Sequence, residues 1–300
     1  MKRLLFVVVT ILISCTSFAQ TRAELYDSYN SAISKKDLTS LVSLISNWEK
    51  LYPNDAELYS VKANYYFQNA VNDVIVMSGT PPTDGRECFE LRDSLGVKSY
   101  MYSELQIDSV KLDSAKEVLA EGISKHPDRL DLRLGKVTIH LYVQENELAV
   151  QEVQSALEHS IKNDNKWVEA LDNPIETDGV SYLRDCIQDY LSQLLNVNDI
   201  VIAEKMIDTC IQLYPKEAVF VSDKGTLRFY SDDLKNALEW FLKARKLSPD
   251  DMLITNNIAN IYKMQGDKKN ALKYYRIIAK SGDEYFAEIA QTAIQELNGE

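Results

Sequence analysis

Small apolar residues recur along the chain at a fixed spacing. Successive intervals between them are 34, 54, 34 and 34 residues, so one interval holds 20 extra positions. Leu41 extends the series backward with an insertion of 40 residues. A period of this length is typical of repeated helix pairs that bury their apolar faces against one another. The recurring positions are Ala115, Ala149, Ala203, Ala237 and Ala271.

Prolines keep the same register as these small residues. Each follows the small or apolar position of its repeat by twelve residues. Because proline cannot continue a helix, these positions mark where a helix pair ends. Two residue types in one register indicate an internal repeat. The prolines are Pro53, Pro127, Pro215 and Pro249.

Apolar positions inside a repeat have helical spacing. Ala237, Phe241 and Ala244 fall at i, i+4 and i+7, on one face of a helix. Gly266-Asp267 separates the apolar segments 257–262 and 271–275, which predicts a turn between two helices.

This pattern resembles the tetratricopeptide repeat (TPR), a pair of antiparallel helices. The resemblance implies an all-α fold, a right-handed α-solenoid of stacked pairs, forming a single domain over residues 20–300. Gly122 and Cys210 stand where the family usually has alanine. A last helix with one apolar stripe would cap the array. We expect helical hairpins at 22–55, 56–129, 130–163, 184–217, 218–251 and 252–285, and a capping helix at 286–298.

Residues 71–110 interrupt the second hairpin. Thr80–Gly85 contains two prolines and a glycine and cannot be helical. Cys88–Leu91 and Val97–Tyr102 flank Asp93–Gly96, which predicts a small β-hairpin. An isolated two-stranded hairpin is marginal in water, so we expect it to lean on the solenoid. The insertion is either a lid or partner contact, or a surface elaboration.

A second insertion, residues 164–183, separates the third and fourth hairpins. It contains Trp167, Pro174 and Gly179. Trp167 either fills the gap where stacking is broken or stacks on a ligand.

The first 19 residues have the form of a secretory signal peptide. Two basic residues precede the apolar run Leu4–Ile13, and Ser17 and Ala19 are small, as a signal peptidase requires. The run is too short to span a bilayer. An alternative cleavage, resembling that of bacterial lipoproteins, would leave a lipid anchor on Cys15. We therefore expect an exported protein of the periplasm or envelope, soluble if cleavage follows Ala19.

Charge and motifs limit the function. The formal charge of −12 at pH 7 argues against binding of nucleic acid or anionic lipid headgroups. The sequence contains no GxSxG, P-loop, GxGxxG or HExxH motif, and His126, His140 and His159 are scattered. We therefore expect no catalytic, cofactor or metal site. Cys186 and Cys210 either form a disulfide across one hairpin or remain free thiols.

A TPR array binds on a concave surface lined by the first helix of each pair. Asparagine both donates and accepts hydrogen bonds, which suits an extended peptide backbone, and aromatic side chains supply contact area. The resemblance places these candidate partner-binding residues on that surface: Asn30, Asn64, Phe67, Tyr142, Asp189, Asp223, Phe229, Tyr230, Asn256, Asn257, Asn260 and Lys263.

These observations lead to two functional hypotheses. The first is a non-enzymatic protein-interaction scaffold of the bacterial envelope, which binds an extended peptide or a partner protein. The family's carboxylate-clamping version relies on several basic groove residues, and here Lys263 is nearly alone. The alternative is an envelope lipoprotein that binds a small ligand or a glycan.

Overall fold

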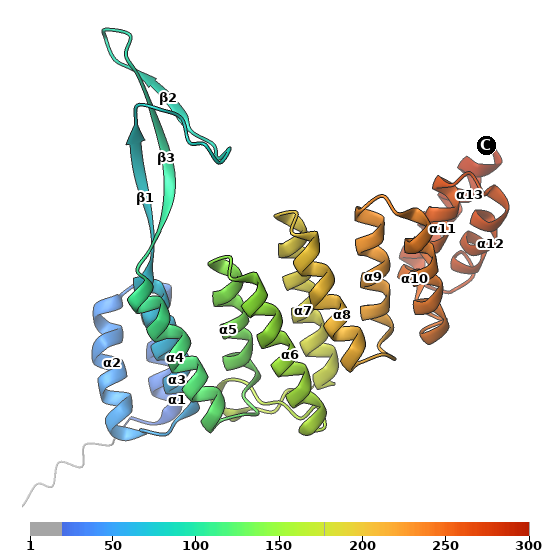
Figure 1. The fold of residues 1–300 in the computed structure, drawn as a ribbon. Helices are drawn as coiled ribbons and strands as arrows, with labels where there is room; N and C mark the ends of the chain where they lie inside the picture. The colour runs from blue at the N-terminus through green and yellow to red at the C-terminus, as the bar shows by residue number, and fades with distance from the viewer. Residues whose placement is uncertain (1–19, 177, 300) are drawn as a thin grey trace, which may run out of the picture.

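Helices follow one another in pairs through the computed structural model, which describes residues 20–176 and 178–299. Figure 1 shows the pairs side by side in chain order, from one end of the array to the other. The expected signal peptide at 1–19, with Cys15, lies outside the described residues. The helices are α1 (Arg22–Ser34), α2 (Leu38–Leu51), α3 (Ala56–Ala70), α4 (Ser109–Lys125), α5 (Leu130–Tyr142), α6 (Asn146–Lys162), α7 (Gly179–Asn196), α8 (Ile200–Leu213), α9 (Ala218–Tyr230), α10 (Leu234–Leu247), α11 (Met252–Met264), α12 (Lys268–Ile278) and α13 (Glu284–Asn298).

Each odd-numbered helix up to α11 packs against the even-numbered helix that follows it, and neighbouring pairs pack on each other. Helix α13 packs on α12 and α11 at the end of the array. The predicted all-α solenoid is therefore confirmed. Helix α7 begins at Gly179, five residues before the expected hairpin at 184–217.

The turn inside a pair has one backbone geometry in five of the described pairs. A residue with positive φ is followed at once by an acidic residue that caps the second helix. In four of the five, the capping residue is an aspartate whose carboxylate accepts a backbone N–H of the first helical turn. Such a cap satisfies an otherwise unpaired donor and complements the helix dipole. The positive-φ residues are Lys36, Gln144, Asn198, Asp232 and Gly266.

The recurring alanines are the points of closest helix packing. All five (Ala115, Ala149, Ala203, Ala237 and Ala271) have no exposed surface. Where two helices approach even more closely, glycine replaces alanine. A Cβ atom on Gly122 of α4 would lie 2.7 Å from the Cβ atom of Tyr59 on α3. The departure from the family pattern at Gly122 thus has a steric cause.

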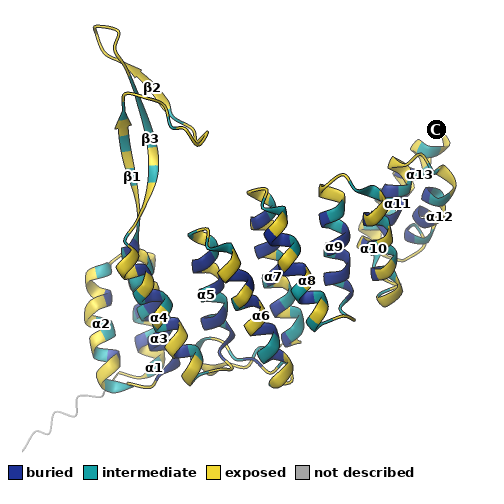
Figure 2. Cartoon of the chain, in the orientation of Figure 1, coloured by how far each residue is buried: buried dark blue, intermediate teal, exposed yellow. Residues whose placement is uncertain are grey.

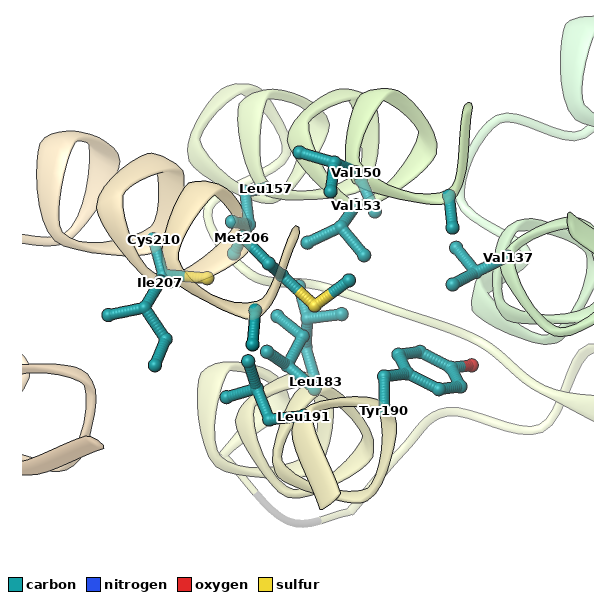
Figure 3. Close-up of a cluster of buried hydrophobic side chains, with 14 of the residues drawn as sticks. Val137, Val150, Val153, Leu157, Leu183, Tyr190, Leu191, Met206, Ile207 and Cys210 are labelled. Atoms are coloured by element: carbon teal, nitrogen blue, oxygen red, sulfur yellow. The ribbon is translucent and has the colours of Figure 1, made fainter. Parts of the chain in front are cut away.

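The apolar core divides into four clusters along the array, and each cluster draws side chains from more than one helix pair. Side chains of α6, α7 and α8 interdigitate in its middle, and Cys210 is buried among them (Figure 3). Because each pair contributes one side to the core of the next, no pair buries its apolar residues alone. The side chains at this point include Val150, Val153, Leu157, Leu183, Leu191, Met206 and Ile207.

The 71–110 insertion forms a three-stranded antiparallel arm in the order β1-β3-β2. Its strands are β1 (Val71–Ser78), β2 (Phe89–Arg92) and β3 (Lys98–Ile107). The predicted hairpin is present as β2 and β3, whereas β1 was not predicted. The expectation that the insertion leans on the solenoid is wrong: the arm projects from the ends of α3 and α4, away from the helices (Figure 1). The third strand supplies the support that a two-stranded hairpin lacks.

The connection between α6 and α7 runs back beneath the preceding pairs, and we call residues 163–176 the strap. The Trp167 side chain holds it in place, buried to 2% exposure, with its indole Nε1 donating to Ser160 Oγ at 3.0 Å. A ligand-stacking role for Trp167 is therefore wrong, and local packing is confirmed. The main chain of Val168 bridges to Arg129, at the start of α5.

Polar contacts extend the strap as far as the first helix. The backbone N–H of Leu171 donates to Glu57 on α3. Asp172 forms an ion pair with Arg22 on α1, with 2.9 Å between Nη2 and Oδ2. Glu57 is itself paired with Arg129 at 2.7 Å, and both side chains are almost fully buried. Burial raises the pKa of Glu57, with the Arg129 hydrogen bond acting in the opposite direction. The strap thus ties three helix pairs together through charged groups, of which Glu57 and Arg129 are almost fully buried and Arg22 and Asp172 are partly exposed.

Substitution of Gly122 by alanine tests the steric cause of this glycine. Alanine favours the helix by about 1 kcal/mol, but the clash with Tyr59 costs more, and overpacking typically costs about 1–3 kcal/mol. We expect Gly122→Ala to lower the melting temperature. Gly135→Ala is the matched control, because the nearest atoms to a Cβ at Gly135 lie at 3.8 Å or beyond. We expect this control to melt at the same or a higher temperature. Equal stabilisation by both substitutions would contradict the packing argument.

Candidate binding surface

All twelve candidates lie on first helices of their pairs: Asn30 on α1, Asp189 on α7, and the other ten on α3, α5, α9 and α11. Helix α3 carries two of them, α5 one, α9 three and α11 four. Asn256 does not join the surface, because its side chain is buried and faces the inside of the array. The others on these four helices divide into a C-terminal group on α9 and α11 and an N-terminal group on α3 and α5.

Four residues of the C-terminal group line a pocket of about 300 Å³ between α9 and α11. Phe229 and Tyr230 come from the end of α9, and Asn257 and Asn260 from the middle of α11. The Phe229 and Tyr230 rings meet edge to face, with 6.5 Å between centroids. Tyr230 is 65% exposed, so its ring is free to contact another molecule. This pocket places two aromatic rings beside two amides.

Asn260 also lines a second pocket, of about 490 Å³, formed with the capping helix α13. Its Oδ1 accepts a hydrogen bond from the Tyr275 hydroxyl at 2.6 Å. Lys263 lies at the same pocket, and its Nζ forms an ion pair with Glu296 Oε2 at 2.6 Å. The basic group on this surface is therefore already engaged by a carboxylate of the chain itself.

The N-terminal group is partly occupied by contacts within the chain. Phe67 and Tyr142 meet edge to face across α3 and α5, with 5.3 Å between ring centroids. Asn64 donates to the hydroxyl of Tyr29. Tyr142 nevertheless remains 47% exposed.

Tyr142 lines a pocket of about 710 Å³ that the sequence did not predict. The pocket lies between the α5–α6 turn and the α7–α8 turn, which the 20-residue insertion separates in the repeat register. Its polar lining is mostly amide groups, which both donate and accept. The sequence did contain a signal for this pocket in its recurring turn residues. Gln144 and Asn198, both amides, directly precede the residues that cap α6 and α8. The amides are Gln144, Asn146, Gln193, Asn196 and Asn198.

Asp223 sits deeper than a surface residue, between α7 and α9. It lines a small pocket of about 100 Å³. Its Oδ1 receives a long hydrogen bond of 3.4 Å from Gln188, and its Oδ2 is buried without a partner. Burial raises the pKa of the Asp223 carboxyl to about 7, with Gln188 and Arg184 acting in the opposite direction and Glu217 reinforcing the shift. The Asp223 carboxyl group is thus buried at a cost in free energy and is not an exposed contact for a partner.

The described residues contain no group of three or more His, Cys, Asp or Glu side chains arranged to hold a metal ion. Cys88, Cys186 and Cys210 are free thiols, so the disulfide between Cys186 and Cys210 is not formed. Burial raises the pKa of both Cys186 and Cys210, which disfavours the reactive thiolate.

Three positive-φ turn residues, Asn198, Asp232 and Gly266, follow one another at intervals of 34 residues, each joining two packed helices. The fold is a TPR-like solenoid. TPR arrays present extended surfaces for binding other molecules.

No protein-family model matches the sequence, and no curated protein matches it. Among solved structures, a TPR protein from Parabacteroides merdae is 12% identical, with a TM-score of 0.38 over 92% of this chain and 86% of the other. The C-terminal part of a TPR repeat-containing protein from Cytophaga hutchinsonii is 13% identical, with a TM-score of 0.41 over 91% and 95%. YrrB, described as a TPR protein with an unusual peptide-binding site, is 16% identical, with a TM-score of 0.34 over 78% and 90%.

No helix in the described part of the chain combines the length and the apolar character that crossing a bilayer demands.

The pKa of Asp223 makes a prediction about stability. In the unfolded chain this carboxyl ionises near its ordinary pKa of 3.8, whereas in the folded chain it holds its proton up to about pH 7. The folded state therefore binds more protons between these values, and its stability falls as pH rises from about 4 to 7. We expect Asp223→Asn to raise the melting temperature at pH 8 and to change it little at pH 4.5.

Asp189→Asn, an exposed carboxylate on the neighbouring helix α7, is the control and should not alter the pH dependence. The measurement is thermal unfolding followed by circular dichroism across this pH range. If Asp223→Asn melts at the same temperature as wild type at pH 8, burial of the ionised Asp223 carboxylate does not destabilise the fold.

Proposed function

We propose that the chain is a non-enzymatic interaction scaffold that binds an extended peptide or partner protein along its first helices. The pocket formed by Phe229, Tyr230, Asn257 and Asn260 carries this proposal. An extended peptide exposes backbone donors and acceptors in alternation, and the two asparagine amides meet both needs. The two rings supply rigid apolar contact at low entropic cost.

Charge supports a neutral or basic partner. The chain carries a formal charge of −12, and Lys263 is already paired with Glu296. A partner rich in carboxylates would meet repulsion and find no free cation at this pocket, so recognition of an acidic tail is not supported. We propose the bacterial envelope as the site of action, on the strength of the signal-peptide pattern at 1–19. Cleavage after Ala19 would leave a soluble chain, whereas cleavage before Cys15 would leave a lipid-anchored one.

A second candidate function is favoured by the amide-rich pocket at Tyr142. Neutral oligosaccharides are bound through paired hydrogen bonds to amides and through stacking on an aromatic face, and this pocket offers both. A thermal-shift screen with neutral oligosaccharides separates the two functions. A ligand at 100 times its dissociation constant would add roughly 2.7 kcal/mol to the unfolding free energy. Tyr142→Ala should abolish any such shift.

The peptide-binding proposal is tested by placing a photo-crosslinking amino acid at Tyr230 in the mature chain, expressed in its native host. Val201 on α8 is the matched control, because it is exposed to almost the same extent, 67%, on a second helix. We expect a discrete crosslinked partner from position 230 and none from position 201.

Asn257→Ala combined with Asn260→Ala should reduce that crosslink about tenfold or more, since two amide hydrogen bonds are each worth about 1 kcal/mol. Tyr275→Phe removes the Asn260–Tyr275 hydrogen bond without changing the two amides, and controls for its structural effect. Equal crosslinking from positions 230 and 201, or an undiminished product in the double variant, would rule out this pocket as the binding site.

A further inference from the structure

One face of the β-arm is apolar and uncovered. Cross-strand partners in an antiparallel sheet share a face, so the register assigns each side chain to one side. Met77, Met101 and Phe89 form a row across all three strands. Around this row the same side of the sheet carries Val71, Ile75, Leu91, Leu105 and Ile107. We call this side the apolar face.

The opposite face of the arm is partly covered. The connection between β1 and β2 folds over it, with the Arg86 guanidinium 5.7 Å from the ring centroid of Tyr102 and its Nη1 donating to the carbonyl of Ser103 at 3.1 Å. Val74 and Val76 are half-buried there. On the apolar face, Ile75, Met77 and Phe89 are 74%, 65% and 71% exposed. Figure 2 shows the arm mostly in the exposed colour, in contrast to the buried helix faces.

The apolar face is large enough to form an interface. Six of its side chains are exposed hydrophobics, and at roughly 100 Å² each they present on the order of 600 Å². This exposed apolar area is at the upper end of the range found for the largest apolar patch on a typical monomer. It is about three quarters of the roughly 800 Å² that each partner buries in a stable complex. The six are Ile75, Met77, Phe89, Leu91, Leu105 and Ile107.

The charge distribution favours contact through the arm. Asp73 is the charged residue that the register places on the apolar face, near the base of the arm. Two copies of a chain with a charge of −12 repel each other. Exposed charges separated by more than about 8 Å are largely screened at physiological ionic strength. Asp73 aside, a contact at the apolar face brings uncharged side chains together on an arm that projects away from the helices (Figure 1).

Other ways of covering the face fit less well. Insertion into a bilayer would leave the outer edges of β1 and β2 with unpaired backbone groups in hydrocarbon, at several kcal/mol each. Pairing of β1 edges between two chains would leave the apolar side chains in water. Packing face to face at about 10 Å, as two sheets do in a sandwich, buries these side chains directly.

We propose that two copies of this chain dimerise by packing their apolar faces together about a two-fold axis. The face is its own complement, because apolar side chains meet apolar side chains whichever copy contributes them. Every other copy carries the same face, so this surface is available in proportion to the protein's own concentration. The proposal is independent of the partner-binding pocket on α9 and α11.

Sedimentation equilibrium of the mature chain between about 1 and 100 µM tests the proposal. We expect the weight-average mass to approach twice the monomer mass. Ile75→Thr with Phe89→Thr keeps residues suited to strands and should weaken the dimer about 100-fold or more. Leu95→Thr with Val110→Thr is the matched control, since these exposed side chains lie in the β2–β3 turn and on α4, off the apolar face. We expect the control to dimerise as wild type does.

Cysteine trapping keeps the test decisive if the threonine variant fails to fold. In a background with Cys88→Ser, Ser103→Cys lies in the apolar face, whereas Glu104→Cys points to the opposite side of the same strand. Mild oxidation should produce a covalent dimer from Ser103→Cys and not from Glu104→Cys. A wild-type chain that stays monomeric at 100 µM would overturn the proposal. Equal trapping at both positions, or sedimentation with neutral phosphatidylcholine vesicles that Phe89→Thr abolishes, would also overturn it.

Discussion

The close approach of successive helices at fully buried small residues is the contact on which the rest of the structure depends. Each helix pair has one side that only a neighbouring pair can cover, so the array is stable only if the axes come near enough to exclude water. Alanines with no exposed surface allow this at Ala149, Ala203 and Ala237. At Gly122 even a methyl group is too large, because Tyr59 already fills its position. The larger side chains of the core can interdigitate only because these positions are small.

The repeat could be predicted because its characteristic residues recur at short, fixed distances along the sequence. A helix pair closes on itself within about 34 residues, so the small residue, the turn and the terminal proline recur at distances that a sequence shows directly. The strap and the third strand could not be found this way. Leu171 donates to Glu57 across 114 positions of sequence, and Val71 at the start of β1 pairs with Ile107 at the end of β3. Such pairings depend on three-dimensional proximity that no period records.

The candidate binding surface likewise has features that the sequence predicted and features that only three-dimensional proximity creates. The resemblance to the TPR family placed Phe229, Tyr230 and Asn257 on one surface, and the structure gathers them around one pocket. Periodicity could not show that Asn256, one position earlier, turns inward. Nor could it bring together the amides of the α5–α6 and α7–α8 turns, because the intervening insertion changes how the fourth pair sits on the third. Exposure and juxtaposition are properties of packing, and each has to be read from the structure.

The strap changes how the array responds to mechanical load. In an ordinary solenoid each repeat contacts only its neighbours, so the repeats can separate one after another from either end. Here residues 163–176 clamp α1, α3 and α5 through Arg22, Glu57 and Arg129. Tension along the chain would therefore peel the C-terminal helices away stepwise, while the N-terminal half would resist until the clamp itself gave way. The projecting arm grows out of α3 and α4, so it is attached to the half of the array that the strap ties together.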